Sequence, residues 1–329
     1  MYATDNMTSQ HACRICHNAS GNNVIIAREM MLALGDEFEY LECGNCGCFQ
    51  LLTIPHDFSR YYPEHYYSYK LTVDYKNNAL KSFFKHKRAI SYFEGKGLLG
   101  KLIIRISGVP ISYPWLAKCH ARFDFDILDV GCGNGALLCH LRGDGFKSLT
   151  GIDPLIEKDT TYSNGVRILK RQLSEMNDSF DIIMLHHSFE HMPDPVDAMH
   201  HLYRLLRNDR RLLIRLPLAD SHARRYYGIN WVQMDAPRHL FLHTKKSMEL
   251  LAEMSGFEIE DIVYDSTEFQ FWGSEHYKNG ISLIDPRSKV LLKGGRALKS
   301  KEMKKYRKKA SELNAKQEGD SACFYLYKQ

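Results

Sequence analysis

The sequence predicts an α/β fold in which helices cover a mostly parallel sheet, and two observations support this prediction. From Phe125 onwards, short apolar runs alternate with helical segments, which is the pattern of parallel strands joined by helices. Two late apolar runs, 257–264 and 322–327, are expected to form an antiparallel pair at the edge of that sheet. The runs expected to form the other strands are 125–130, 148–153, 166–170, 180–185 and 211–216.

Two further segments are expected before this predicted core. Residues 11–52 are expected to form a small module of turns and short strands, and residues 53–121 a helical, aromatic linker and cap. The core itself spans 122–329, and within it residues 268–318 are expected to form a helical lid over the site. The core helices are expected at 136–142, 195–206 and 245–255.

Composition indicates a globular protein. The 329 residues are 44% hydrophobic and 25% charged, and no apolar run reaches the roughly 18 residues of a membrane span. The first ten residues are polar and resemble no secretory signal, so we expect a cytoplasmic location. The net charge of +5 gives little support for an anionic partner. The basic stretch 293–309 is interpreted as a solvated helix face.

A glycine-rich turn follows the first strand of the core. The run 127–135 has glycine at every second position after the strand, which suits a tight turn that brings a ligand close to the backbone. Asp153, at the end of the next strand, can accept hydrogen bonds from two ribose hydroxyls. Asp129 can reach the amino group of a methionine moiety, which NAD lacks. The dinucleotide-binding fingerprint Gly-x-Gly-x-x-Gly remains an alternative interpretation of this turn. Its last position is Ala136, and the fingerprint tolerates alanine there.

Cysteines cluster near the start of the chain. Five of the nine lie between residues 13 and 48, and a cytosolic chain rarely uses disulfides, so the cluster indicates a metal site. Two Cys-x2-Cys knuckles supply the four thiolates of a closed structural zinc site. Cys48 and His17 are spare ligands, and reduced structural cysteines are the alternative. The predicted ligands are Cys13, Cys16, Cys43 and Cys46.

Several of these motifs, in this order, resemble the class I S-adenosylmethionine-dependent methyltransferases. Residues 129–135 resemble the first motif of that family, 180–185 its fourth strand and 187–195 the segment that follows. Residues 205–214 resemble the turn into its fifth strand, except that Asn-Asp-Arg stands at 208–210 where the family has Pro-Gly-Gly. The resemblance implies a Rossmann-like fold and S-adenosylmethionine as cofactor. It implies these cofactor-binding residues: Asp129, Gly131, Gly133, Gly135, Asp153, Gln172 and Leu185.

The cysteine module and the core together resemble the subset of this family that acts in sugar and polysaccharide biosynthesis. The acceptor implied is a small molecule such as a nucleotide-linked or lipid-linked sugar. An alternative is an RNA base or ribose methyltransferase that uses the zinc module and the basic stretch to bind RNA. The chain lacks the Asn/Asp-Pro-Pro-aromatic motif and the Pro-Cys nucleophile of such enzymes. A scaffold without activity is a third hypothesis.

Histidines are the candidate general bases, because methyl transfer often requires removal of a proton from the acceptor. His187 and His191 follow the fourth strand and His239 follows the fifth, so all three are expected to overhang the site. Asp235 and Arg238 either orient a base, bind an anionic substrate or form a salt-bridged turn. The aromatic stretches 61–69 and 271–277 either pack against a sugar ring or belong to the core.

Overall fold

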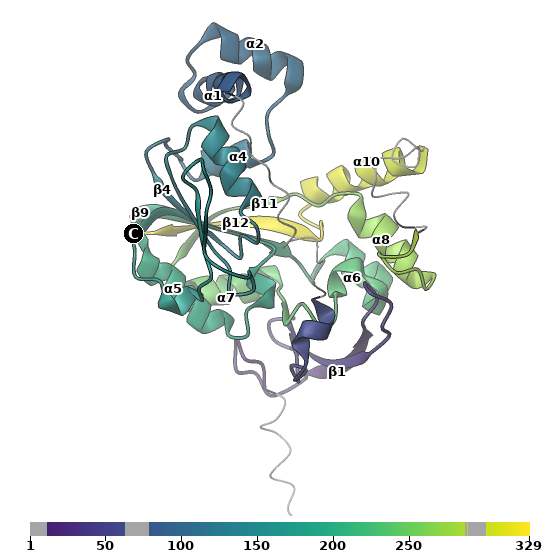
Figure 1. Ribbon diagram of the computed structural model, residues 1–329. Coiled ribbons are helices and arrows are strands. Elements are labelled where there is room, and N and C mark those ends of the chain that lie inside the picture. Colours follow the sequence, from purple (N-terminus) through teal and green to yellow (C-terminus); the bar gives the residue numbers. More distant parts are fainter. Residues whose placement is uncertain (1–11, 63–78, 287, 289–300) are drawn as a thin grey trace, which may run out of the picture.

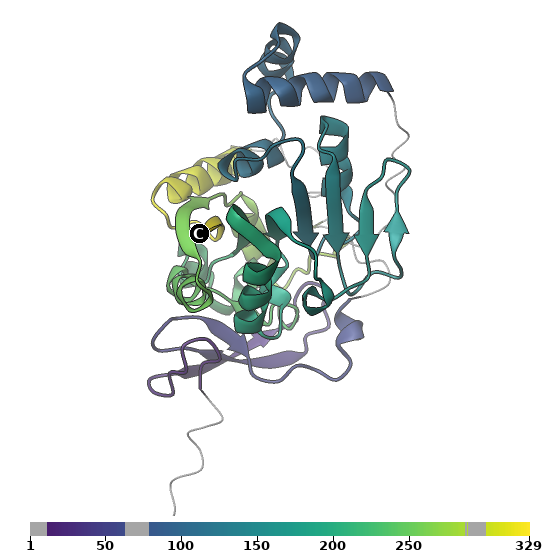
Figure 2. The same cartoon turned by 90° about the vertical axis from the view of Figure 1, so that its left-hand side faces the viewer.

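The computed structural model describes residues 12–62, 79–286, 288 and 301–329 (Figures 1 and 2). Its centre is a mixed sheet of eight strands, mostly parallel, so the predicted fold class is confirmed. The last strand of the chain runs antiparallel to both of its neighbours. In spatial order the strands are β11 (Glu258–Tyr264), β12 (Ser321–Lys328), β9 (Leu206–Pro217), β8 (Phe180–His186), β4 (Asp126–Val130), β5 (Ser148–Ile152), β7 (Arg167–Leu169) and β6 (Thr160–Thr161).

Several of the predicted core strands and helices form for local reasons. β4 and β8 are almost wholly buried and most of their side chains are apolar, as expected of central parallel strands. α5 (Pro195–Leu205) begins with Pro195, and Asp194 caps it by accepting hydrogen bonds from two backbone N–H groups. α7 (Lys245–Ser255) starts at a Thr244 capping box and ends at Gly256 in the left-handed conformation. α4 (Ala136–Asp144) follows the glycine turn.

The sheet differs from the prediction in two details. The late strands do form an antiparallel pair, but only β11 lies at the edge, since β12 inserts between β11 and β9. Residues 208–210, expected in a turn, lie within β9. Its register against β8 jumps there, with Phe180 opposite Leu206 and Ile182 opposite Arg211, and Asp209 has a φ of 58°. The segment is therefore a bulge in the strand.

The N-terminal module shares a sheet with the core. β1 (Asn23–Arg28), β2 (Glu37–Glu42) and β3 (Phe49–Leu51) continue into β10 (Phe241–Leu242), which belongs to the segment after β9. The Thr244 hydroxyl donates to the Cys46 carbonyl at 2.6 Å, and the Tyr40 hydroxyl donates to the His239 carbonyl at 2.8 Å. The module therefore holds the segment that carries His239.

Helices before and after the core strands complete the fold. α1 (Ala79–Glu94) and α2 (Leu98–Ser107) form a hairpin at the end of the molecule opposite to the N-terminal module (Figures 1 and 2). α3 (Ser112–Lys118) leads into β4, and α6 (His222–Tyr227) follows β9. α8 (Phe269–Lys278) and α10 (Lys301–Ala315) fall within the predicted lid segment. Across the described ranges, no helix combines the length and apolarity needed to span a bilayer.

Candidate active site

The turn after β4 requires its glycines. Gly131, Gly133 and Gly135 all have positive φ values, of 75°, 53° and 71°. A Cβ atom on Gly131 would lie 2.3 Å from the Ser188 side chain, and one on Gly135 would lie 2.4 Å from Ile168. The turn is thus closely packed against Ser188 and Ile168, and it leads directly into the first turn of α4.

Two buried carboxylates lie beside this turn. Asp129 is on β4, and Asp153 directly follows the neighbouring β5. Asp153 accepts hydrogen bonds from the Gly133 and Leu155 backbone N–H groups, at 3.0 and 2.9 Å. Burial raises the pKa of Asp129 to about 8, with a further contribution from the charge of Asp153, and burial also raises the pKa of Asp153. Such a pair favours a ligand that brings a positive charge and hydroxyl donors.

The remaining predicted cofactor residues lie at different distances from the turn along the sheet. Leu185 is on β8 opposite Val130, so its strand adjoins the turn, and its side chain is buried. Gln172 is exposed after β7, which is two strands away from β4. Gln172 caps a short 3-10 turn, Leu173–Glu175.

A cluster of histidines surrounds one buried carboxylate after β8. Glu190 is fully buried, and His187 Nδ1 and His239 Nε2 lie 3.4 and 3.9 Å from its Oε1 atom. Burial opposes the charge on Glu190, but the nearby histidines 187, 191 and 239 lower its pKa to about 2. The three candidate histidines, which the sequence places in two separate loops, thus lie around one carboxylate. The sequence shows Glu190 beside His191, but the position of Glu190 at the centre of the cluster depends on His239, a residue of a distant segment.

Hydrogen bonds to carbonyl groups fix the tautomers of two of these histidines. His191 Nδ1 lies 2.7 Å from the Arg238 carbonyl oxygen, and His239 Nδ1 lies 2.8 Å from that of Gln233. A carbonyl only accepts, so both Nδ1 atoms carry the proton and both Nε2 atoms keep a lone pair. Burial lowers the pKa of His239 to about 4, so this ring is neutral near pH 7.

The third histidine is differently placed. His187 has a φ of 52°, and its Nε2 contacts the guanidinium of Arg215, while its Nδ1 faces Glu190. Both ring nitrogens of His187 therefore have protein partners. His191 is partly buried, and among the described residues no side chain forms a hydrogen bond with its Nε2 atom.

The histidine cluster adjoins the glycine turn. The Ser188 hydroxyl donates to the Val130 carbonyl at 2.7 Å, and Ser188 packs behind Gly131. The charge of His191 also acts on Asp153, whose pKa it lowers slightly against the effect of burial. The ligand atoms of Glu190, His191 and His239 all lie within 4.8 Å of one another. The cluster can thus bind a proton, or a divalent cation, close to a ligand held by the turn.

Arg238 forms a salt-bridged turn and has no free face for an anionic substrate. Its side chain is fully buried, and it donates to Asp235 at 2.6–3.1 Å and to Glu29 of the N-terminal module at 2.8 Å. A further N–H group donates to the Tyr61 carbonyl. Of the three roles that the sequence left open for Arg238, the salt-bridged turn is the one that fits these contacts.

The structure also bears on the aromatic stretches and on the basic stretch. The aromatic residues at 271, 272 and 277 are buried, in agreement with a core role. The basic residues at 304, 305, 307 and 308 are exposed on α10, as expected of a solvated face. Residues 63–69 of the tyrosine-rich stretch and 293–300 of the basic stretch lie outside the described residues.

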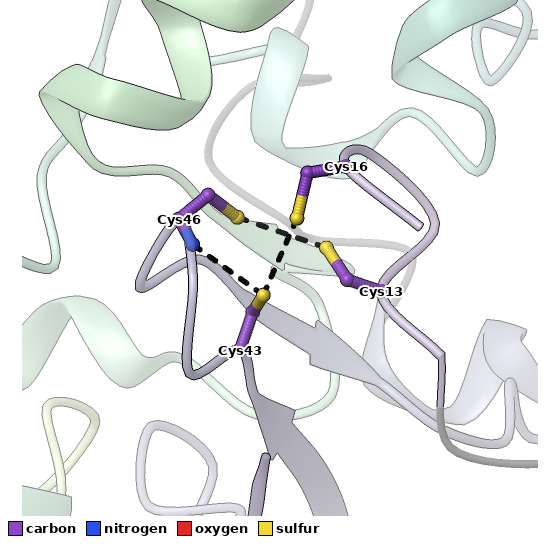
Figure 3. A group of neighbouring side chains, drawn as sticks. All are labelled: Cys13, Cys16, Cys43 and Cys46. Atoms are coloured by element: carbon purple, nitrogen blue, oxygen red, sulfur yellow. Dashed lines mark hydrogen bonds between the residues drawn. The ribbon is translucent and has the colours of Figure 1, made fainter. Parts of the chain in front are cut away.

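The four predicted metal ligands come together in the N-terminal module (Figure 3). Cys13 and Cys46 have their Sγ atoms 3.7 Å apart, and Cys16 and Cys43 have theirs 3.5 Å apart. All four sulfur atoms lie within 4.8 Å of one another. The Asn45 and Cys46 backbone N–H groups donate to Cys43 Sγ at 3.4 and 3.5 Å.

Comparison with known proteins agrees with this geometry. Residues 82–262, more than half of the chain, match a family described as a methyltransferase domain. A ubiquinone biosynthesis O-methyltransferase of Pseudomonas putida (strain W619) is 29% identical over 175 residues, which cover 47% of this chain and 73% of that protein.

Two solved structures are also similar. A cyclopropane synthase from Mycobacterium tuberculosis has a TM-score of 0.41 at 17% identity, covering 68% of this chain and 88% of that one. The geranyl diphosphate C-methyltransferase of Streptomyces coelicolor A3(2) has a TM-score of 0.43 at 12% identity, covering 66% and 78%. From the family match over more than half its length, the chain belongs to the class I S-adenosylmethionine-dependent methyltransferases.

Proposed function

We propose that this methyltransferase acts on a hydroxyl oxygen of a small-molecule acceptor and that His191 takes up the hydroxyl proton. S-adenosylmethionine supplies a methyl group made electrophilic by its sulfonium. Gly131, Gly133 and Gly135 give its methionine half room along the turn, bordered by Leu185. Asp129 accepts from its amino group and Asp153 from its ribose hydroxyls. Gln172 is assigned to the adenine edge.

The observation that carries the proposal is the tautomer of His191. Because its Nδ1–H is held by the Arg238 carbonyl, its Nε2 lone pair is available beside the cofactor turn. Glu190 stays ionised across the physiological range, so it stabilises the imidazolium formed when His191 accepts a proton. His239 and His187 surround the same carboxylate, and we assign them to positioning it.

For the acceptor, we propose a sugar or another intermediate of glycan synthesis. The resemblance of the cysteine module and core to that subset supports this choice. An O-methyltransferase name among the similar proteins supports oxygen as the methylated atom. A panel of nucleotide-linked sugars, aromatic hydroxyl compounds and RNA, tested with labelled S-adenosylmethionine, separates the acceptor classes. Labelling of the aromatic compounds or of RNA alone would exclude a sugar acceptor.

Replacing His191 with Ala is expected to lower kcat by about 10²–10⁴-fold, because the acceptor proton loses its base. The affinity for S-adenosylmethionine, measured calorimetrically, should change little. His201→Ala is the matched control, since His201 is a partly buried residue of α5, paired with Asp197 and outside the histidine cluster, and its loss should leave kcat unchanged.

Two results would contradict the base assignment. One is a His191→Ala variant that retains full turnover with its preferred acceptor. The other is a divalent cation, distinct from any ion held by the four cysteines, that turnover requires and that is lost from His191→Ala but retained by Cys43→Ser, because Glu190, His191 and His239 would then be acting as metal ligands.

We also propose that Cys13, Cys16, Cys43 and Cys46 hold a structural Zn²⁺ ion. A tetrahedral site with Zn–S bonds of about 2.3 Å requires sulfur atoms roughly 3.8 Å apart, close to the separations within the two cysteine pairs. Four thiolates leave no open position for a substrate, so the ion would stabilise the module.

Metal analysis should find about one zinc per chain, and Cys43→Ser should reduce it to near zero. Because β3 of the module pairs with β10, that variant should also lower Tm and turnover together. Cys139→Ser is the control, since Cys139 is buried on α4 away from the cluster. Zinc content unaffected by the Cys43 substitution would rule out this site.

A further inference from the structure

The helical hairpin α1–α2 is firmly attached to the core and separate from the active site. Gly100 is buried against α1, where an added Cβ would lie 2.2 Å from the Lys87 carbonyl oxygen. His86 contacts the Asp144 carbonyl on α4 at 2.9 Å. The hairpin lies beyond the amino ends of strands such as β4, whereas the glycine turn and histidine cluster follow the carboxyl ends (Figure 2).

Apolar side chains gather on the solvent side of this hairpin. Leu98, Leu102 and Ile106 are 85%, 54% and 77% exposed, and their spacing of four residues places them on one face of α2. Nine of the eighteen exposed large hydrophobic residues in the described ranges fall between positions 80 and 111. A gathering of this kind marks an interaction surface. The other six members are Leu80, Phe83, Phe84, Leu99, Val109 and Ile111.

The same hairpin is strongly basic. Between positions 80 and 111 the chain has seven Lys or Arg residues and a single acidic residue, Glu94. On α2, Lys101 and Arg105 are exposed. At 100° per residue, they project beside the stripe of Leu98, Leu102 and Ile106. An apolar stripe flanked by cations is the pattern of a helix that lies in a membrane interface.

We propose that the α1–α2 hairpin binds the surface of an anionic lipid bilayer. The exposed apolar side chains of α2 would enter the headgroup region while Lys101 and Arg105 bind lipid phosphates. Charge favours this occupant over a second copy of the chain, because self-association would bring two basic stripes together. The geometry points to a peripheral tether that leaves the carboxyl edge of the sheet free to receive its acceptor.

Flotation with vesicles tests this inference independently of the acceptor. Wild-type protein should bind vesicles of phosphatidylglycerol and phosphatidylcholine, bind pure phosphatidylcholine weakly, and dissociate as salt is raised. Lys101→Glu with Arg105→Glu should weaken binding at least about tenfold. Leu98→Ser with Leu102→Ser and Ile106→Ser should do the same. Neither variant should change calorimetric binding of S-adenosylmethionine.

The matched control removes exposed apolar residues elsewhere. Val24→Ser with Ile26→Ser alters two exposed side chains of β1, at the opposite end of the molecule, and should leave vesicle binding intact. Equal binding of the wild type and the hairpin variants would overturn the proposal. So would light scattering that shows a dimer dispersed by the Leu98, Leu102 and Ile106 substitutions, since that face would then join two copies.

Discussion

Replacement of Arg238 with Met should destabilise the protein by about 3–5 kcal/mol, because it leaves two buried carboxylates without their cation. Glu29 is fully buried and Asp235 nearly so, and Arg238 bonds to both at 2.6–3.1 Å. The free energy of unfolding by urea measures the effect. Met has a similar apolar length, so a cavity contributes little.

A surface ion pair between β1 and β2, next to Glu29 in the chain, provides the control. Arg28 and Glu37 form an ion pair at 2.8 Å, but their side chains are 62% and 51% exposed, so Arg28→Met should cost less than about 1 kcal/mol. Equal losses from the two substitutions would show that burial does not govern the Arg238 interaction. Adding Glu29→Gln to Arg238→Met should recover part of the lost unfolding free energy. The double variant no longer has an unpaired buried carboxylate at position 29.

Lowering the pH should reduce the difference in unfolding free energy between the wild type and Arg238→Met. Arg238 lowers the pKa of Asp235 in the wild type despite the opposing effect of burial. A depressed carboxyl pKa contributes stability above the unfolded pKa of about 4, and that contribution is lost as pH falls through the folded pKa. The wild type should therefore lose more stability than the variant below about pH 4.

The local features of this fold follow from sequence, whereas its long-range pairings do not. Buried apolar runs predict β4 and β8, and Pro195 after Asp194 predicts the start of α5, because each signal lies within a few residues. The pairing of Arg238 with Glu29 joins positions 209 residues apart. Periodicity does not encode such a pairing, nor the insertion of β12 between β9 and β11.

The candidate site likewise has a part that the sequence predicts and a part that depends on contacts between distant segments. The glycine turn and Asp153 form one contiguous strand–turn–helix–strand unit, so their relation could be predicted. The histidine cluster draws on the segments after β8 and after β9, and its chemistry depends on which ring nitrogen is bonded. The carbonyl of Arg238, which orders His191, comes from the second of these segments. No sequence pattern identifies a backbone acceptor that only folding brings into place.

Affinity for S-adenosylhomocysteine should rise on the order of tenfold between pH 6 and pH 7.5. Burial and the charge of Asp153 raise the pKa of Asp129 to about 8, so this carboxyl is mostly protonated at pH 6. The amino group of the ligand is a cation over that interval and prefers the carboxylate. Binding therefore releases a proton from Asp129, and each increase in pH lowers the free-energy cost of that release. Calorimetry in buffers of different ionisation enthalpy measures the proton directly.

A ligand without the amino acid part isolates the contribution of Asp129. Methylthioadenosine keeps the ribose that Asp153 would bind, so any pH dependence it shows reports Asp153, whose pKa burial also raises. The steeper dependence of S-adenosylhomocysteine should disappear in Asp129→Asn, which keeps the shape of the side chain but cannot ionise. Equal pH dependence for the two ligands in the wild type would mean that Asp129 does not meet the amino group, and the methionine half would then lie elsewhere along the turn.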